Sequence, residues 1–280
     1  MDDPQGNGAL GGTVAERMRR RFGDGALSWA EALPARLDRL AAAWGLTLGR
    51  AFPGGGSGVA LRVERAEGPA VLRVSPDPAF AAAQLTALRV FAPTGRVPGV
   101  HAVDLDEGAL LLELVEGGAG WPEPDAFGAL LRDLHSADPG PVRDWPDLAA
   151  WTEEFLPRFT PTGPVTAAHL ALARSRVGAL LADPGPAPVL LHGDLHATNV
   201  VGRRRVIDPR PCVGDPEFDA VDFVLAGPDV PARLDALAAA LPSLDAGRLG
   251  AWCRALAPVV AVAKARTGHD VGALLEHAEV

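Results

Sequence analysis

Apolar residues recur at helical spacing in the segment SWAEALPARLDRLAAAWGL, which begins at Ser28. Ser28 and Glu31 have the spacing of a capping box, and Pro34 is a position where a helix can restart. The pattern predicts a helix with one face packed on a core. The preceding start of the chain, MDDPQGNGALGG, has no such pattern and predicts a flexible tail over residues 1–12.

The period then changes to that of β-strands. The segments FPGGGSGVALRVE and AVLRVS, joined by the turn RAEGP, predict two paired strands, and a cluster of glycines opens the first. After the break SPDP a helix is predicted over about 79–91. Strand-like segments follow, of which LLLEL at 110–114 is the most apolar. The first part of the chain is therefore predicted to be rich in β-structure.

The segment VEGGAGWPEP, rich in glycine and proline, is the best candidate for a boundary between two lobes. Beyond it the chain is mostly helical in pattern, and short strands with polar turns are expected only over 189–225. We predict an α+β, bilobal fold with a β-rich N-lobe over 13–116, a mainly helical C-lobe over 117–280 and a cleft between them. The C-lobe helices are expected at about 125–136, 165–182, 231–241, 246–266 and 270–278.

The acidic balance of the chain narrows the choice of partners. The formal net charge is −9 over 280 residues, so a nucleic acid is not expected as a partner, and a cationic ligand suits the chain better. Cys212 and Cys253 lie far apart without CxxC partners, which argues against a zinc ribbon and fits a reducing compartment. The sequence has no signal-peptide pattern and no apolar run of about 18 residues. We expect a cytoplasmic protein without a membrane partner, as a monomer or weak dimer.

The segment LHGDLHATNVVGRRRVID carries the polar residues that indicate chemistry. NVV and VID predict a hairpin around the turn GRRR, so Asn199 and Asp208 should emerge at the same end. Asp194 lies on the loop that leads in. An amide oxygen and a carboxylate suit Mg²⁺, which leaves its other positions to water and phosphates. Asp194 could then orient a hydroxyl and accept its proton, as in phosphoryl transfer.

The glycine cluster in the N-lobe is a candidate phosphate-binding loop. Its residues are Gly54, Gly55, Gly56, Ser57 and Gly58. Missing side chains let backbone N–H groups approach a triphosphate, and the serine adds a hydroxyl. A flexible β-turn without a ligand is the alternative, and the cluster alone does not decide between the two. Its position before a strand pair favours the phosphate-binding interpretation.

The histidines admit more than one interpretation. His192 and His196 have the spacing of a metal pair on a helix, but the residues between them favour a loop that the imidazoles support. His135, at the end of LLRDLH, is expected to pack or to cap its helix. GDLH and GDPEFD also resemble fragments of binuclear metallophosphoesterases, whose further histidine motifs this sequence lacks. A nucleotide-binding protein without catalysis is a third alternative.

HGDLHATN, followed by VIDP and GDPEFD, resembles the motifs of the aminoglycoside phosphotransferase family, which has the eukaryotic-protein-kinase-like fold. The run VIDPRPCVGDPEFD and the helical segment from Ser28 are similar to the streptomycin 6-kinase branch of that family. The resemblance covers most of the chain and is weakest towards the C-terminus. It implies Asp194 as catalytic base, with Asn199 and Asp208 as Mg²⁺ ligands. The other expected site residues are Glu113 and Val115 at the nucleotide base, His196, Glu217 and Asp222 at the acceptor, and His192, Asp215 and Asp219 as structural supports.

One pair of positions departs from the family pattern. The family has a lysine on the second N-lobe strand, paired with a helix glutamate, to hold the nucleotide phosphates. Here AVLRV places Arg73 on that strand, and the helix offers Gln84. Arginine keeps the charge but presents it as a planar fork. Three outcomes stay open: a kinase with altered phosphate contacts, a weak kinase, or a nucleotide-binding relic.

The sequence thus predicts an enzyme that transfers the γ-phosphate of ATP or GTP, with Mg²⁺, to a hydroxyl of a cationic small molecule. The resemblance implies an aminoglycoside antibiotic as acceptor, with streptomycin at its 6-hydroxyl as the first choice and resistance as the biological role. A different hydroxylated metabolite or antibiotic is the alternative.

Overall fold

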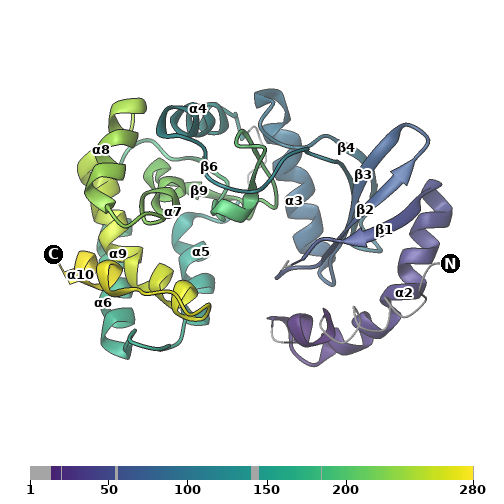
Figure 1. Ribbon diagram of the computed structural model, residues 1–280, viewed down its shortest axis with the longest axis horizontal. Helices are drawn as coiled ribbons and strands as arrows, with labels where there is room; N and C mark the ends of the chain where they lie inside the picture. Colours follow the sequence, from purple (N-terminus) through teal and green to yellow (C-terminus); the bar gives the residue numbers. More distant parts are fainter. Residues whose placement is uncertain (1–13, 20, 54–55, 140–144, 184, 280) are drawn as a thin grey trace. The chain divides into compact units, whose positions relative to one another are not determined.

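A computed structural model describes residues 14–19, 21–53, 56–139, 145–183 and 185–279 (Figure 1). The predicted tail over 1–12 lies outside the described residues, and so do two glycines of the candidate phosphate-binding loop, Gly54 and Gly55.

The chain divides into two compact units. The first runs up to Arg89 and includes Pro98–Val115, and the second consists of Val90–Val97 and the chain from Glu116 onward. The division after Val115 lies near the boundary at 116/117 that the glycine-rich segment suggested. The grouping of Val90–Val97 with the second unit was not anticipated, because its apolar pattern continues that of the preceding helix.

An antiparallel sheet forms the centre of the first unit (Figure 1). Within the described residues its strand order is β1-β2-β3-β5-β4. The predicted pair joined by RAEGP is the hairpin of β2 and β3, in register from Val59 opposite Val74 to Arg65 opposite Gly68. The strands are β1 (Thr47–Ala51), β2 (Val59–Arg65), β3 (Gly68–Val74), β4 (Val100–Asp104) and β5 (Ala109–Glu113).

Helix α2 (Gly25–Trp44) packs on one face of this sheet. Trp29 and Leu33 of the helix share a buried cluster with Leu72 of β3. The helix passes Pro34 without ending and begins before Ser28, so the expected capping box is wrong. Ser28 instead donates its hydroxyl to the Gly25 carbonyl at 3.1 Å.

Helix α3 (Pro78–Phe91) lies on the opposite face of the sheet (Figure 1). Because side chains alternate along a strand, Arg73 of β3 points away from the cluster that holds Leu72. Its guanidinium lies 5.5 Å from the ring centroid of Phe80 in α3. The short helix η1 (Ala92–Thr94) follows α3.

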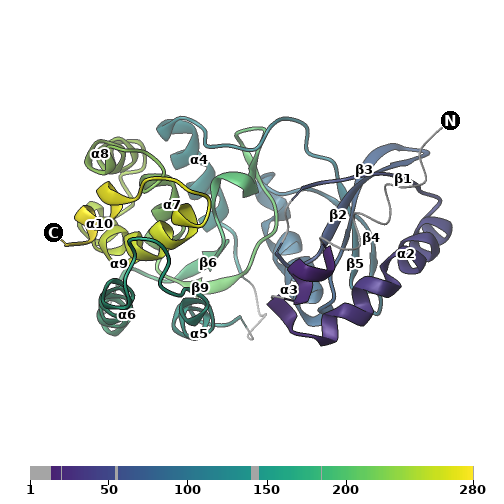
Figure 2. The ribbon, with the colours of Figure 1, turned by 60° about the horizontal axis from the view of Figure 1, so that its bottom comes forward.

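The second unit is mainly helical, and its long helix α9 is buried along most of its length. Helices α6 and α10 lie side by side with α9 (Figure 2). Helix α5 was not predicted, because it is short and follows a proline-rich stretch. The helices are α4 (Pro124–His135), α5 (Leu148–Phe155), η2 (Leu156–Arg158), α6 (Ala167–Ala182), α7 (Val221–Val224), α8 (Val230–Ala240), α9 (Ala246–Ala265) and α10 (Gly272–Glu279).

Two small antiparallel pairs interrupt these helices within the predicted polar stretch over 189–225. Strand β6 (Val189–Leu191) pairs with β9 (Cys212–Gly214), and β7 (Val200–Val201) pairs with β8 (Arg205–Val206). The short helices η3 (Ala197–Asn199) and η4 (Pro216–Ala220) also lie in this stretch, which ends with α7. Among the described residues, no helix is both long enough and apolar enough to cross a membrane.

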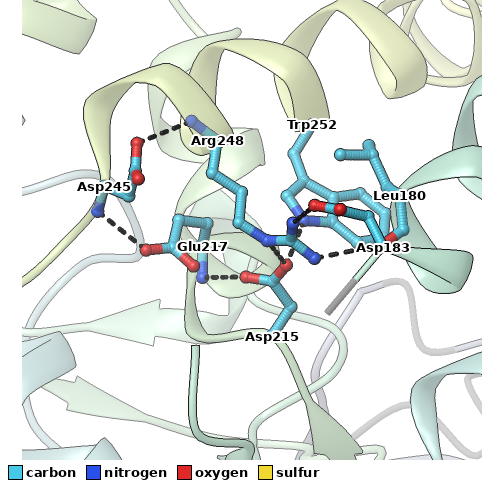
Figure 3. A network of polar contacts seen from close by, with 7 residues as sticks. All are labelled: Leu180, Asp183, Asp215, Glu217, Asp245, Arg248 and Trp252. Carbon is cyan, nitrogen blue, oxygen red and sulfur yellow. Dashed lines mark hydrogen bonds and ion pairs between the residues drawn. The ribbon is translucent and has the colours of Figure 1, made fainter. Parts of the chain in front are cut away.

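A polar network around Asp215 fastens α9 to the chain after β9 (Figure 3). Asp215 Oδ1 caps η4 by accepting the Glu217 N–H at 3.1 Å. Its Oδ2 accepts the Trp252 Nε1–H at 2.8 Å and the Arg248 Nε–H. Burial favours a raised pKa at Asp215, but the hydrogen bonds with Glu217, Trp252 and Arg248 outweigh it and lower the pKa. Asp215 therefore stays ionised in a largely buried place.

Arg248 extends the network to the end of α6 (Figure 3). Its Nη1 donates to Asp183 Oδ2 at 2.9 Å, and its Nη2 donates to the Leu180 carbonyl at 3.1 Å. The planar guanidinium can make these bonds and the bond to Asp215 at once. One side chain of α9 therefore joins α6 and η4.

Glu217 lies inside the protein beside Asp215, with only 1% of its surface exposed. Its Oε1 accepts the Asp245 N–H at 2.8 Å. Burial, followed by the hydrogen bond to Asp215, raises the pKa of Glu217 to about 7. The sequence had placed Glu217 among the acceptor-binding residues. Since its carboxyl group is enclosed under the start of α9, Glu217 is not open to an acceptor and acts as a structural residue.

We predict that Glu217→Gln changes how the stability of the protein depends on pH. The folded chain raises the pKa of Glu217 to about 7, so the folded protein favours the protonated carboxyl. The stabilisation from this proton is complete below the ordinary pKa of glutamate and is lost as the pH rises to 7. Glutamine stays neutral and can still bond to Asp245 and Asp215. We compare the free energies of unfolding of variant and wild type, measured in urea titrations. Their difference should change by roughly 2 kcal/mol in favour of the variant when the pH is raised from about 5 to about 8.

The matched control is Glu276→Gln, which removes an exposed carboxylate from α10. Its difference from the wild-type protein should stay nearly constant with pH. A constant difference for Glu217→Gln as well would contradict the raised pKa.

Candidate functional site

The loop of residues 192–199, here called the HGD loop, is held by the buried carboxylate of Asp219. Asp219 Oδ2 accepts the His192 N–H at 2.7 Å, and Oδ1 accepts the Gly193 N–H at 2.9 Å. The residue is 2% exposed, and burial alone would raise its pKa. Hydrogen bonding and the charge of His135 outweigh burial and lower the pKa of Asp219. A buried anion therefore fixes the backbone of the loop.

His135, at the end of α4, is a further ligand of this carboxylate. Its Nε2 lies 3.1 Å from Asp219 Oδ2, so the ring nitrogen donates to the carboxylate. Sequence reasoning had assigned His135 only a packing or capping role. The two residues lie 84 positions apart, and no pattern in the sequence linked them.

His192 supports the HGD loop from within. Its ring is fully buried, and its Nε2 bonds to the Ile207 carbonyl at 3.0 Å. Its Nδ1 accepts the Asp194 N–H at 3.3 Å. One ring nitrogen therefore donates and the other accepts, as in a neutral imidazole, and burial lowers the pKa of His192. The ring links the HGD loop to the residue just before Asp208.

Position 193 requires a glycine for two reasons, its backbone angle and the lack of space for a side chain. Its φ is 74°, in the left-handed region, and a Cβ there would stand 2.1 Å from the Arg210 carbonyl oxygen. Any side chain would push apart the HGD loop and the segment that follows β8.

The structure brings Asp194, His196 and Asn199 together. Asn199 Nδ2 donates to the Asp194 carbonyl at 2.8 Å, and His196 Nε2 lies 3.3 Å from the same nitrogen. His196 Nε2 also lies 3.7 Å from Asp194 Oδ1. Because its amide nitrogen is used inside the loop, Asn199 has its amide oxygen to offer a metal ion. The Asp194 side chain is 30% exposed, which leaves it open to a ligand.

The predicted hairpin places Asp208 next to Asn199. Strands β7 and β8 pair antiparallel, and the Ile207 N–H donates to the Asn199 carbonyl at 3.0 Å. Asp208 follows directly and has a φ of 57°, which is uncommon for a residue with a side chain. Backbone strain of this kind persists where the surrounding structure fixes the residue, and it is concentrated at active sites.

The oxygens of Asn199 and Asp208 make a donor set that fits Mg²⁺. In the described part of the chain there is no group of three or more histidine, cysteine, aspartate or glutamate residues that could hold a metal ion. One amide and one carboxylate suit a hard cation that takes water and phosphate oxygens for its other positions.

In the first unit, Ser57 and Arg73 contact each other where the sequence predicted a phosphate site. Arg73 Nη2 donates to Ser57 Oγ at 2.8 Å, and Ser75 Oγ donates to the Ser57 carbonyl at 2.8 Å. A Cβ on Gly58 would stand 2.4 Å from the Val74 carbonyl, so the loop needs glycine to approach β3. Arg73 is 5% exposed and Gln84 of α3 is 1% exposed.

The predicted nucleotide-base segment begins at the last residue of β5. Glu113 is tied to Gly99 twice: its N–H donates to the Gly99 carbonyl at 2.8 Å, and its Oε2 accepts the Gly99 N–H at 3.0 Å. Val115, two residues further on, is half-buried and has no regular secondary structure. The carboxylate of Glu113 therefore braces the strand end, and any contact to a base would come from the backbone.

Asp222 in α7 lies within electrostatic reach of Asp194. Burial is the main cause that raises the pKa of Asp222, to about 6, and the Asp194 charge adds to it. His196 and Lys264 act in the opposite direction. Of the predicted acceptor residues, His196 lies against Asp194, and Asp222 is near enough for the two carboxylates to interact electrostatically.

Sequence comparisons identify the family of the chain. The model of the phosphotransferase enzyme family matches residues 48–259. A streptomycin 6-kinase of Streptomyces glaucescens is 31% identical over 267 residues, which is 85% of each chain. A hydroxyurea phosphotransferase of Kitasatospora aureofaciens is 31% identical over 261 residues, covering 85% of this chain and 75% of the relative.

A solved structure supports the fold. An aminoglycoside phosphotransferase in complex with ADP and hygromycin B superposes with a TM-score of 0.59 over 86% of this chain and 93% of that one, at 17% identity. The predicted kinase-like α+β fold is confirmed. By its motifs, its fold and the length of the match, this chain belongs to the phosphotransferase enzyme family.

Proposed function

We propose that the protein transfers the γ-phosphate of ATP or GTP to a hydroxyl of an aminoglycoside antibiotic, with streptomycin as the leading acceptor. The observation that carries the proposal is the hydrogen bond from Asn199 to the Asp194 carbonyl, in a loop anchored by Asp219. It supports a fixed carboxylate next to an amide oxygen, which is the polar arrangement that phosphoryl transfer needs.

In the proposed reaction, Asp194 accepts a hydrogen bond from the acceptor hydroxyl and takes up its proton as the oxygen attacks the γ-phosphorus. The bond from that phosphorus to the β,γ-bridging oxygen breaks, and the nucleoside diphosphate leaves. Asn199 and Asp208 would hold Mg²⁺, which when bound neutralises phosphate charge. Ser57, Gly58 and Arg73 of the first unit would hold the nucleotide phosphates, and the backbone of Glu113 and Val115 would hold the base.

The streptomycin 6-kinase relative supports a cationic acceptor. Asp222 supports it as well, because a half-buried carboxylate whose pKa is raised to about 6 gains more from a cationic partner than an exposed one does. The net charge of −9 would help to attract such a ligand. His196, which contacts both Asp194 and Asn199, would border the acceptor hydroxyl.

Hydroxyurea is the second candidate acceptor, and it rests on the similarity to the Kitasatospora aureofaciens enzyme. It is small and uncharged at neutral pH, so it would need Asp194 but would gain nothing from the charge of Asp222. The effect of Asp222 on the KM therefore distinguishes the two candidate acceptors.

We predict that Asp194→Asn abolishes transfer while nucleotide binding is kept. The amide cannot take up the hydroxyl proton, so kcat should fall by at least about 100-fold. Transfer is followed by ADP release and by the mass of the phosphorylated acceptor, and nucleotide binding by calorimetry with a non-hydrolysable ATP analogue. Unchanged turnover would contradict the role of Asp194. Turnover of neither streptomycin nor hydroxyurea by the wild-type protein would contradict both proposed acceptors.

We predict that Asp222→Asn raises the KM for streptomycin by about tenfold, because a charge-assisted contact is lost. The KM for hydroxyurea should not change. For the wild-type protein, the KM for streptomycin should rise as the pH falls through about 6, where Asp222 takes up a proton, and the variant should lack this rise. Asp235→Asn, which removes an exposed carboxylate from α8, is the control. Equal effects of the two substitutions would count against Asp222 as an acceptor contact.

A further inference from the structure

Arg96, just after η1, is bound through its backbone to the hairpin of β7 and β8. The Val206 N–H donates to the Arg96 carbonyl at 2.7 Å. Val206 belongs to β8 and lies two residues before Asp208. Arg96 and the hairpin are parts of the same compact unit, because Val90–Val97 groups with the second unit. The bond therefore fixes β8 close to one of the two residues expected to hold Mg²⁺.

The Arg96 side chain extends this contact to the turn of the hairpin and to helix α4. Its Nη1 donates to the Arg204 carbonyl in the turn at 3.3 Å. Its Nε and Nη2 donate to Asp133 Oδ2 in α4, at 2.9 Å and 2.6 Å. The Arg96 side chain is 22% exposed and that of Asp133 is 35% exposed, so water screens the pair only in part. One side chain therefore joins the hairpin to α4.

Helix α4 also supports the HGD loop. His135, two residues after Asp133 in the last turn of α4, bonds to the Asp219 carboxylate that anchors the loop. The end of α4 thus holds the HGD loop through one residue and the hairpin through another. Because Arg96 makes the second of these links, it relates the position of the hairpin to that of the loop.

Backbone bonds hold the other strand of the hairpin. The Gly202 N–H donates to the Gly118 carbonyl at 3.1 Å, and the Gly120 N–H donates to the Val200 carbonyl at 2.9 Å. These bonds involve no side chain. Loss of a side-chain contact on the β8 side therefore leaves β7 attached, and its effect is confined to β8 and the residues that follow it.

We propose that Arg96 is a positioning residue that holds β8, and with it Asp208, in the place where Asp208 and Asn199 can bind one Mg²⁺ ion together. The inference rests on the proposed function, since it needs these two residues to bind the metal. Because Mg²⁺ demands near-ideal octahedral geometry, a small displacement of one ligand lowers the affinity of the site. Arg96 acts through the hairpin and is not itself a ligand.

The two acceptors of Arg96 explain why an arginine suits this position. The Asp133 carboxylate and the Arg204 carbonyl belong to different elements, and a planar guanidinium can bond to both at once. A lysine presents one compact charge on a flexible stem and lacks this fork. A methionine fills much of the same space and donates no hydrogen bond. Arg96→Lys should therefore keep part of the function of Arg96, and Arg96→Met should lose it.

The first test is hydrogen exchange of the metal-free protein, which does not depend on catalysis. In Arg96→Met, the amides of Val206 and Ile207 should exchange about tenfold faster than in the wild-type protein, because β8 opens more often. The amides of His192 and Gly193 belong to the separately anchored HGD loop and should stay within about twofold.

The matched control is Arg132→Met. Arg132 lies 3.7 Å from the same Asp133 carboxylate, but its side chain is 61% exposed, and an exposed ion pair of this length contributes little. The control should leave exchange in the hairpin within about twofold of wild type.

The second test is metal affinity. Mn²⁺, which takes the same oxygen ligands as Mg²⁺, is titrated into protein held in excess of a non-hydrolysable ATP analogue, and free Mn²⁺ is followed by its EPR signal. Arg96→Met should weaken Mn²⁺ binding by about 5- to 10-fold, Arg96→Lys by less, and Arg132→Met by less than about twofold. In transfer assays the half-saturating Mg²⁺ concentration should rise by a similar factor, while the KM for the acceptor stays unchanged.

The two tests together decide the inference. Faster exchange at Val206 and Ile207 with wild-type Mn²⁺ affinity would overturn it, since Arg96 would then only stabilise the hairpin. Unchanged exchange would overturn it as well, and so would equal effects of Arg96→Met and Arg132→Met. If thermal unfolding shows that Arg96→Met does not fold, Arg96→Lys decides: wild-type exchange and affinity overturn the inference, and a change in both supports it.

Failure of the proposed function is distinguishable, because neither hydrogen exchange nor Mn²⁺ binding requires transfer. A wild-type protein that binds Mn²⁺ with the analogue but phosphorylates neither streptomycin nor hydroxyurea contradicts the proposed function alone. A wild-type protein that binds no Mn²⁺ with the analogue overturns the inference about Arg96.

Discussion

The bonds that Asp219 accepts from the HGD loop are the interaction on which the rest of the site depends. The carboxylate receives the His192 and Gly193 N–H groups and the His135 ring, and it is almost wholly buried. Each donor offsets part of the cost of burying the charge, and removal of one partner would leave that cost unmet. The loop therefore has one backbone path, and Asp194 and Asn199 lie at defined points along it.

Contacts with the surrounding helices fix the position of Asp219. Asp219 is part of η4, and Asp215 at the start of η4 is fastened to α9 and α6 through Arg248. The polar links therefore continue from the end of α6 to the HGD loop within the second unit. Rigidity of this kind suits a reaction in which the protein mainly supplies position and charge.

Motifs within short segments were predictable from the sequence, and contacts between distant segments were not. The hairpin that joins Asn199 to Asp208 followed from two apolar runs around a turn. The sequence predicted Glu217 as an acceptor contact because acidic residues in polar motifs are usually exposed. In the structure the start of α9 covers it. His135 was missed because its partner, Asp219, lies in another segment, and the burial of this pair depends on packing that no local pattern encodes.

Hydrogen exchange combined with transfer kinetics on Asp219→Asn tests the anchoring of the HGD loop most directly. Asparagine keeps the shape but offers one acceptor oxygen and an N–H₂ group in place of the second, so one loop N–H loses its partner. Faster exchange is predicted at His192 and Gly193, with unchanged exchange in β2 and β3 and a fall in kcat of on the order of 100-fold. Wild-type exchange in the loop together with wild-type kcat would show that Asp219 does not hold the site.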